Sequence, residues 1–358
     1  MLKFFELEPE AFGLDISDLS LKAVRLKKRG RFFKLSSWGE LELPKGLIEE
    51  GEIKDAEEIA KNVKKLLSKL KGASLDTRNV AACLPENKAF LQVIKIPAVE
   101  RKEIRNAVLF EAENHIPLPI EKSYLDFQVL PANKGALNFD VLIAAMPKET
   151  VTSYFLCLKK AGLNPLALEI ESQSVSRAIL KKEFSLDPVL IIDFGASVTS
   201  FIIFSGHSLK FTSTIQVSSE DLTAAISKAY KKSFSEAEKL KIKYGLKDKR
   251  ILKAVFPAMN ELAANVKRYI SFYQTHKTKD DSAPEKNISK IILVGRGANL
   301  KGMADFIFSK TKIPAELCNP WVNIIPEPLN EVPGLSYEES IGYATALGLA
   351  LRGVKKEF

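Results

Sequence analysis

The sequence predicts an α/β fold of two lobes, and three elements of the chain support this prediction. Two of them are β-hairpins, residues 12–26 and 189–204, in which an aspartate ends the first strand. These aspartates are Asp15 and Asp193. The third element is an apolar strand, residues 291–294, that breaks into a glycine turn. A hairpin repeated in this way is typical of two lobes that hold a phosphate chain between them.

The two aspartates define the chemistry expected at the hairpins. An unpaired carboxylate in a core strand would cost several kcal/mol, so Asp15 and Asp193 should face a cation or backbone N–H groups. Two such carboxylates can orient a hydrated Mg²⁺ that bridges phosphate oxygens. We therefore expect both residues to be catalytic and to hold Mg²⁺ through water. The alternative is two buried strands whose aspartates cap turns, which are common.

The glycine turn adds a third contact to the expected site. A strand, a glycine turn and a helix N-terminus bring backbone close to a planar or anionic ligand. In chain order the three elements resemble the first phosphate, second phosphate and adenosine motifs of the actin-like ATPase superfamily. The resemblance implies ATP as cofactor and these binding residues: Ser17, Ser20, Lys22, Gly195, Ala196, Thr199, Gly295, Arg296 and Gly297.

The middle of the chain narrows the family. Residues 84–85, 93–97 and 110–119 look like the inserted subdomain of the type IV pilus assembly protein PilM family, and the segment from Glu111 to Pro119 is the most specific. The resemblance covers nearly the whole chain. It implies an α/β, actin-like two-lobed ATPase fold with an inserted ferredoxin-like α+β subdomain.

The expected division of the chain has three parts. Residues 1–188 form the first actin-like lobe, which contains the inserted subdomain at 80–166. Residues 189–335 form the second lobe, and residues 336–358 form a C-terminal helix that returns to the first. Inside the insertion we expect strands at 80–84, 91–96, 124–129 and 139–145, and helices at 101–114 and 148–161.

Composition limits the location of the protein. At 358 residues the chain exceeds one ordinary hydrophobic core, which agrees with two lobes. No apolar run reaches the roughly 18–20 residues that cross a bilayer, and the first residues do not resemble a signal peptide. The three cysteines, Cys83, Cys157 and Cys318, lack metal-ligand spacing. This favours buried thiols in a reducing cytoplasm.

The formal net charge of +9 favours an anionic partner. The basic residues are scattered over helical stretches, such as those around Lys64 and Lys231, without an aromatic stacking platform. We therefore expect peripheral contact with the inner face of the cytoplasmic membrane and no nucleic acid. For any single cluster, a solvated helix face is the alternative.

Departures from the family pattern weaken the expected nucleotide chemistry. The first phosphate turn carries Asp18 where the family has a small hydroxyl residue. A carboxylate some 4 Å from a phosphate would be opposed by about 4 kcal/mol at an effective dielectric near 20, unless Mg²⁺ or Lys22 screens it. Asp18 could instead turn to solvent or cap its own hairpin. Arg296 replaces a glycine and would either stack on adenine or block it. We expect at most a weak ATPase.

The resemblance implies a cytoplasmic scaffold for pilus assembly, or for a related competence or secretion system. Its inserted subdomain would bind the cytoplasmic tail of a bitopic PilN-like membrane protein and connect it to the pilus motor and platform, with ATP setting the angle between lobes. One alternative is an ATP-dependent phosphotransferase of the same superfold, for which Glu171 is the one candidate base. Another is a cell-division actin homologue of the FtsA kind.

Overall fold

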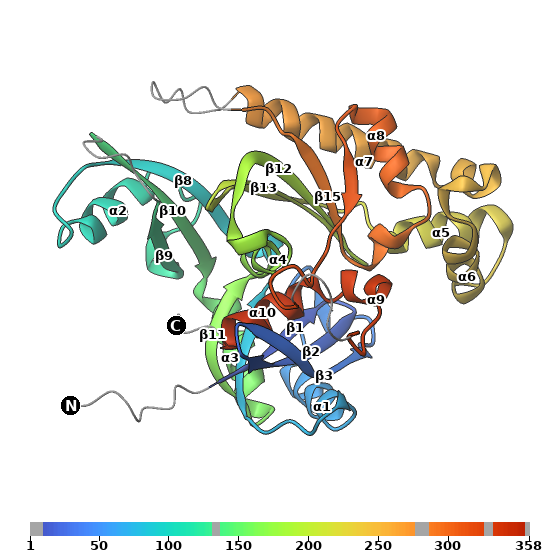
Figure 1. Cartoon of the computed structure of the whole chain (residues 1–358), viewed down its shortest axis with the longest axis horizontal. Coiled ribbons are helices and arrows are strands. Elements are labelled where there is room, and N and C mark those ends of the chain that lie inside the picture. The colour runs from blue at the N-terminus through green and yellow to red at the C-terminus, as the bar shows by residue number, and fades with distance from the viewer. Residues whose placement is uncertain (1–9, 131–136, 276–285, 326–331, 355–358) are drawn as a thin grey trace.

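The computed structural model of the chain describes residues 10–130, 137–275, 286–325 and 332–354. The start of the chain, where we expect no signal peptide, and residues 355–358 of the expected C-terminal helix lie outside these ranges. Figure 1 shows two lobes, with β1, β2, β3 and α10 in one and β12, β13, β15 and α7 in the other. In the described part of the chain, no helix combines the length and apolarity needed to cross a membrane.

The first lobe is built on a six-stranded sheet of order β11-β7-β1-β2-β3-β6. Strands β1, β2 and β3 follow one another as an antiparallel meander. On the other side of β1, β7 pairs parallel with β1, and β11 pairs parallel with β7. The strands are β1 (Phe12–Ser17), β2 (Ser20–Arg29), β3 (Phe32–Glu42), β6 (Lys71–Gly72), β7 (Asn79–Leu84) and β11 (Asn164–Ile170), with a small hairpin of β4 (Ile48–Glu49) and β5 (Glu52–Ile53) beside them.

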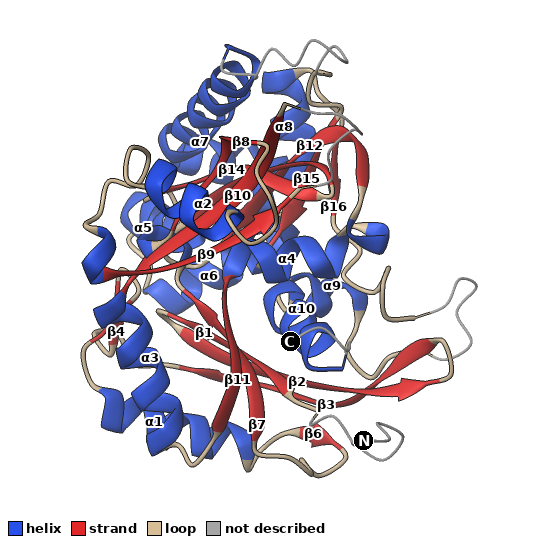
Figure 2. Ribbon diagram, turned by 90° about the vertical axis from the view of Figure 1, so that its left-hand side faces the viewer, coloured by secondary structure: helices blue, strands red, loops and turns tan. Residues whose placement is uncertain are grey.

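Helices cover both faces of this sheet, which is why β1 is buried almost throughout. One face carries α1 (Ala56–Leu67) and α3 (Lys148–Lys160), and the other carries α4 (Glu171–Ile179) and α10 (Ala344–Val354), as Figure 2 shows. Helix α10 lies so close that a Cβ on Gly13 would meet the Ala346 carbonyl oxygen at 2.4 Å. The C-terminal segment therefore returns to the first sheet. It forms two helices, α9 (Tyr337–Ile341) and α10, because the chain turns at Gly342.

The second sheet has the order β16-β15-β12-β13-β14-β8-β10-β9. Its second-lobe strands are β12 (Ser185–Phe194), β13 (Thr199–Gly206), β14 (Ser208–Ile215), β15 (Lys290–Val294) and β16 (Ala315–Leu317). The helices around them are α5 (Ser219–Tyr230), α6 (Phe234–Tyr244), α7 (Lys249–Thr275) and α8 (Met303–Thr311). The β12–β13 hairpin repeats β1–β2, since Asp193 faces Ser200 in register as Asp15 faces Lys22.

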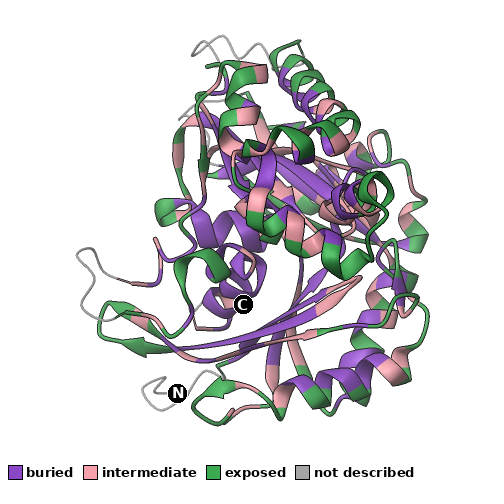
Figure 3. Ribbon diagram, turned by 90° about the vertical axis from the view of Figure 1, so that its right-hand side faces the viewer, coloured by how far each residue is buried: buried purple, intermediate pink, exposed green. Residues whose placement is uncertain are grey.

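The insertion contributes β8 (Phe90–Pro97), α2 (Ile104–Ala112), β9 (Ser123–Val129) and β10 (Asn138–Pro147). These elements have their own small core around Ile94, Val108 and Val141. They join the second sheet through one register pair, Phe211 of β14 with Gln92 of β8. Figure 3, coloured by burial, shows how the core strands of both sheets are enclosed.

The strand set of the insertion differs from the expected ferredoxin-like one. All six elements expected between residues 80 and 166 form, but β7 pairs with β1 and β11, and α3 packs on α1. The strand set differs because the buried run Val80–Leu84 pairs in parallel with β1 and β11 and so belongs to the first sheet. The division of the chain into domains remains our proposal, and we propose from these pairings an insertion of about residues 86–147 in place of 80–166.

Candidate functional site

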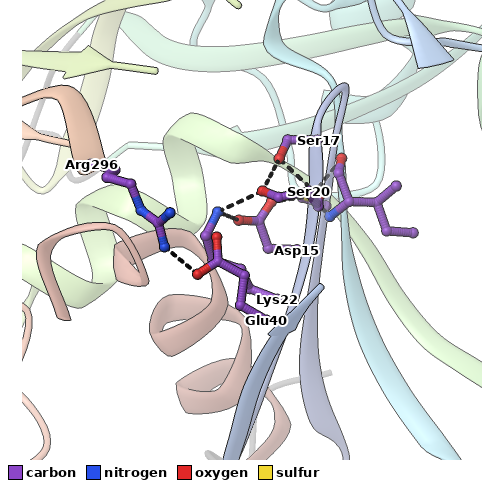
Figure 4. Close-up of polar contacts among 8 residues, drawn as sticks. Asp15, Ser17, Ser20, Lys22, Glu40 and Arg296 are labelled. Atoms are coloured by element: carbon purple, nitrogen blue, oxygen red, sulfur yellow. Dashed lines mark hydrogen bonds and ion pairs between the residues drawn. The ribbon is translucent and has the colours of Figure 1, made fainter. Parts of the chain in front are cut away.

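The first hairpin forms a polar network around Asp15, shown in Figure 4. The Nζ atom of Lys22 lies 3.5 Å from an Asp15 carboxylate oxygen and donates a hydrogen bond to the Ser20 hydroxyl at 3.0 Å. The Ser17 hydroxyl donates to the Ser20 carbonyl oxygen at 3.0 Å. Asp15 and Lys22 are buried, so each charge depends on the other. The structure therefore brings together four residues that the sequence assigns to the first phosphate turn.

Cys83 supports the other side of the Asp15 carboxylate. Its thiol donates to Asp15 at 3.4 Å and accepts a hydrogen bond from the Ile16 backbone N–H at 3.1 Å. Burial raises the pKa of Cys83 well above its usual value, so the thiol stays protonated. All three cysteines are free and buried, as the sequence predicts. The composition alone gave no reason to place Cys83 beside Asp15.

Asp193, the last residue but one of β12, lies next to the same group of charges. Burial, and then the negative charge of Asp15, raise its pKa to about 6, while Lys22 opposes the shift. A Cβ on Gly295 would lie 2.4 Å from an Asp193 oxygen, and Gly295 has a φ of +84°. Only glycine allows this turn to approach the second phosphate strand so closely. The three motifs found in the sequence therefore meet in space.

Glu171 belongs to the acidic group at the lobe junction, although the sequence alone indicates it only as the candidate base of an alternative function. It is the first residue of α4, directly after β11, and its pKa is raised well above the usual value by burial and by the charges of Asp15 and Asp193. Ligand atoms of Asp15, Cys83 and Glu171 lie within 4.8 Å of one another. The signal that could have found it is an acidic residue exactly where a parallel strand passes into a helix, since such ends gather at one sheet edge.

The donor set of this site fits a hard divalent cation. Asp15, Asp193 and Glu171 offer carboxylate oxygens, which Mg²⁺ prefers, and the neutral Cys83 thiol is a poor ligand for it. Besides burial, the carboxylates of Asp15 and Glu86 raise the pKa values of both Asp193 and Glu171, and the Lys22 ammonium opposes the shift at Asp193. The excess of negative charge is one that a cation would relieve.

Several polar groups of the second phosphate turn form hydrogen bonds with other parts of the protein. The Gly195 N–H donates to the Val198 carbonyl oxygen at 3.0 Å, and the carbonyl oxygens of Gly195 and Ala196 accept from the first residues of α5. Thr199 is fully buried, and its hydroxyl donates to the Val217 carbonyl oxygen. Thr199 therefore fixes the turn. To donate a hydrogen bond to a phosphate oxygen, the Thr199 hydroxyl would have to give up this one.

In the adenosine turn, Arg296 has a protein partner that neither expectation included. Its guanidinium forms an ion pair with Glu40 of β3, in the first lobe (Figure 4). Gly297 packs on Phe194, where a Cβ would lie 2.5 Å from the ring. The two glycines thus allow contact with the second phosphate strand, and the arginine between them reaches the opposite lobe.

Asp18 caps a turn, although the turn is not that of its own hairpin. Its carboxylate accepts a hydrogen bond from the Gly51 backbone N–H at 3.1 Å, which caps the β4–β5 turn. Burial raises the pKa of Asp18, and the groups that oppose the shift include the Gly51 N–H and the Ser197 side chain. Asp18 is therefore a partly buried capping residue that faces the second phosphate turn.

A second candidate site is a cavity of about 300 Å³ between the insertion, the first lobe and the second sheet. Its walls come from β9 and β10, from β11 and α4, from the β13–β14 hairpin and from α10. The Ser176 hydroxyl lies in this wall, is buried and has no hydrogen-bond partner among the residues that the structure describes. Arg177, also in the wall, donates to Glu169 at 3.0 Å and to the Gly348 carbonyl oxygen at 3.2 Å.

The two lobes and the three converging motifs define an actin-like fold. Solved structures with this arrangement include MreB5 of Spiroplasma citri bound to AMPPNP, with a TM-score of 0.57 at 13% identity over 97% of this chain and 96% of that one. The ethanolamine utilization protein EutJ of Carboxydothermus hydrogenoformans gives 0.55 at 16% identity, over 97% and 90%. At these identities the likeness concerns the fold alone.

The chain belongs to the family Type IV pilus assembly protein PilM, whose sequence model matches residues 13–354. A solved structure described as a PilM-PilN type IV pilus biogenesis complex has a TM-score of 0.81 and is 29% identical, over 97% of this chain and 99% of that one. The family predicted from residues 111–119 and the other matching segments is thus confirmed.

Cell division protein FtsA is a more distant relative. FtsA of Enterococcus faecalis is 34% identical over 102 residues, which are 28% of this chain and 22% of that protein. FtsA of Enterococcus hirae is 28% identical over 183 residues, 46% of this chain and 41% of that protein. The chain therefore spans less than half the length of these curated relatives.

Proposed function

We propose that this protein is a cytoplasmic scaffold of type IV pilus assembly, or of a related competence or secretion system. In this role it binds the cytoplasmic tail of a PilN-like membrane protein and connects it to the motor and platform of the pilus. The observation that carries the proposal is the cavity beside the insertion in a chain of the PilM family. Its similarity to a chain of a PilM-PilN complex supports the partner.

The cavity has the chemistry of a peptide site. Most of its lining side chains are polar or charged, Phe127, Leu142 and Leu209 add apolar surface, and Ser176 offers a hydroxyl that has no partner among the described residues. β9, whose residues Asp126–Gln128 line the cavity, is the last strand in the order of its sheet. An extended tail can add to such an edge by backbone hydrogen bonds while its side chains enter the cavity.

Filling the cavity tests the proposal. We expect Ser176→Trp to weaken binding of a roughly ten-residue tail peptide from the PilN-like partner by at least tenfold, as measured by isothermal titration with the full chain. Phe155→Ser is the matched control, because Phe155 is exposed on α3 and is not among the cavity's lining residues. Equal peptide affinity of a folded Ser176→Trp variant and the wild type would contradict the proposed site.

We also propose that ATP with Mg²⁺ modulates the scaffold at the lobe junction. Asp15 and Asp193 would hold the ion through water, and Mg²⁺ when bound would neutralise phosphate charge. Ser17, Ser20 and Lys22 would face the phosphates, and the Gly195–Ala196 and Gly295–Gly297 turns would approach the nucleotide. Glu171, which lies beside Asp15 and whose pKa is raised by burial, is the candidate to orient water. Any turnover should be slow, because Thr199 and Asp18 are committed to protein partners.

We place the protein on the inner face of the cytoplasmic membrane. Helix α3 exposes Phe155 and Leu156 between Lys148 and Lys159, and both lysines lie within 6 Å of an aromatic ring. Basic and aromatic side chains in one stripe suit an anionic lipid surface. Co-sedimentation with vesicles containing phosphatidylglycerol should fall for Lys148→Glu/Lys159→Glu and stay unchanged for Lys310→Glu, on α8 of the other lobe. Equal sedimentation of both variants would contradict this placement.

A further inference from the structure

Three of the polar contacts among the described residues connect the two lobes on the side where the phosphate motifs meet. We propose that they form a latch, made of this chain's own side chains, that holds the lobes closed without nucleotide. The inference rests on the proposed nucleotide site. It assigns to Glu40, Lys45 and their partners the role of bridging the two lobes, which a bound nucleotide would otherwise have. Closure itself does not rest on nucleotide binding and can be measured in its absence.

The first contact ends a row of alternating charges. Asp15, Lys22 and Glu40 stand side by side in register on β1, β2 and β3. Side chains in such a cross-strand row share one face of the sheet. The guanidinium of Arg296 continues the row from the second lobe by pairing with Glu40, as Figure 4 shows. Because Glu40 is only 18% exposed, this pair is partly shielded from solvent.

The second contact lies at a different place along the junction. Lys45, in the loop after β3, has its Nζ atom 2.6 Å from a Glu220 carboxylate oxygen at the start of α5. The same ammonium lies 5.2 Å from the centre of the Phe234 ring, the first residue of α6. Lys45 therefore meets two helices of the second lobe with one side chain, through a charge and a cation–π contact.

The third contact lies between the two phosphate turns. Asp18 is held at Gly51 by a hydrogen bond, and its carboxylate faces Ser197 of the second turn. A nucleotide phosphate chain would have to pass between these same turns. The first phosphate turn thus carries, in place of a small hydroxyl residue, a side chain long enough to approach the opposite lobe.

Exposed ion pairs are individually weak, typically about 0–1 kcal/mol, so the latch depends on several acting together. Their attraction is reduced by salt, because the Debye length falls from about 10 Å at 0.1 M to about 3 Å at 1 M. Two properties follow. The closed arrangement should loosen at high ionic strength, and a nucleotide should enter faster once the latch is broken.

The test measures lobe separation in the nucleotide-free full chain. Spin labels at Lys65→Cys on α1 and Lys228→Cys on α5 report the distance between lobes by pulsed electron resonance, since the native cysteines are buried. We expect the otherwise wild-type chain to give one short distance. Glu40→Gln/Lys45→Met should shift the distribution to longer distances.

Asp140→Asn is the matched control, because its ion pair with Lys95 joins two strands of one sheet. It should leave the distance unchanged. If the latch variants give the wild-type distance, or if the wild type is open without nucleotide, the latch does not exist. A closed wild type that fails to bind ATP would instead support the latch and contradict the nucleotide proposal, so the two failures are distinguishable.

Discussion

Arg296 and Glu40 are 256 positions apart in the chain, yet their side chains pair across the lobe junction and end a row of alternating charges that begins at Asp15. Each member of the row has an opposite charge beside it. Removing an inner member should therefore cost more than removing the solvent-exposed end, because a buried charge would lose its partner.

Lys22→Met tests this dependence. The substitution leaves Asp15 buried without its ammonium partner, and we expect a loss of about 2–4 kcal/mol in the free energy of unfolding. Urea unfolding followed by circular dichroism measures it. Lys22→Arg, which keeps the charge, should lose less. A Lys22→Met variant as stable as the wild type would show that Asp15 does not need this partner.

Asp193→Asn should make the chain more stable above pH 6 in the presence of EDTA. The folded-state pKa of Asp193 is raised to about 6, so the folded state binds a proton that the unfolded state, with an ordinary pKa near 4, has already released. Wild-type stability therefore falls as pH rises from about 4 to 6. The advantage of the variant in melting temperature should be largest at pH 7.5 and should vanish at pH 4. An advantage that is independent of pH would contradict the shifted pKa.

Asp18→Ser should not tighten ATP binding tenfold. The carboxylate caps the Gly51 N–H and faces Ser197, so its loss should cost about 1 kcal/mol of stability and leave the repulsion of phosphate a minor effect. Titration of ATP at fixed Mg²⁺, combined with thermal unfolding, separates the two effects. A large gain in affinity without loss of stability would mean that Asp18 faces the phosphates after all.

Gly348→Ala should destabilise the chain by several kcal/mol, although alanine is the better helix former by about 1 kcal/mol. A Cβ at this position would lie 1.8 Å from the Ser174 carbonyl oxygen, so α10 could not stay against α4. Gly342→Ala is the control, since its Cβ would have no contact shorter than 3.4 Å. Thermal unfolding of both variants compares them, and equal melting temperatures would contradict this packing.

Local patterns predicted the elements of the fold better than their partners. The hairpins at Asp15 and Asp193 could be read from strand and turn residues alone, and the buried run of β7 was found within one residue of its observed start. The same run was assigned to the insertion, because nothing in its composition tells whether it pairs with β1 or with β8. Parallel pairing is decided by the whole sheet, and a single sequence does not contain that information locally.

The candidate site follows the same rule. Asp15 and Asp193 stood out because a charge at the end of an apolar strand is costly, and Arg296 stood out as a departure from its motif. Glu40, which pairs with Arg296, and Glu171, which lies beside the two aspartates, come from segments that carry no recognisable motif. Their positions depend on the register of β3 and on the point where β11 passes into α4.

Helix α4 has only nine residues, which at 1.5 Å per residue is about 13 Å of backbone. Its first residue, Glu171, belongs to the acidic group at the lobe junction, while Gln173, Ser176 and Arg177 line the cavity proposed for the partner's tail. A hydrogen-bonded rod of two and a half turns cannot bend between its ends without breaking backbone bonds. A displacement of one end of α4 should therefore move the other end as well. A ligand at the lobe junction and a peptide in the cavity would then act on the same helix.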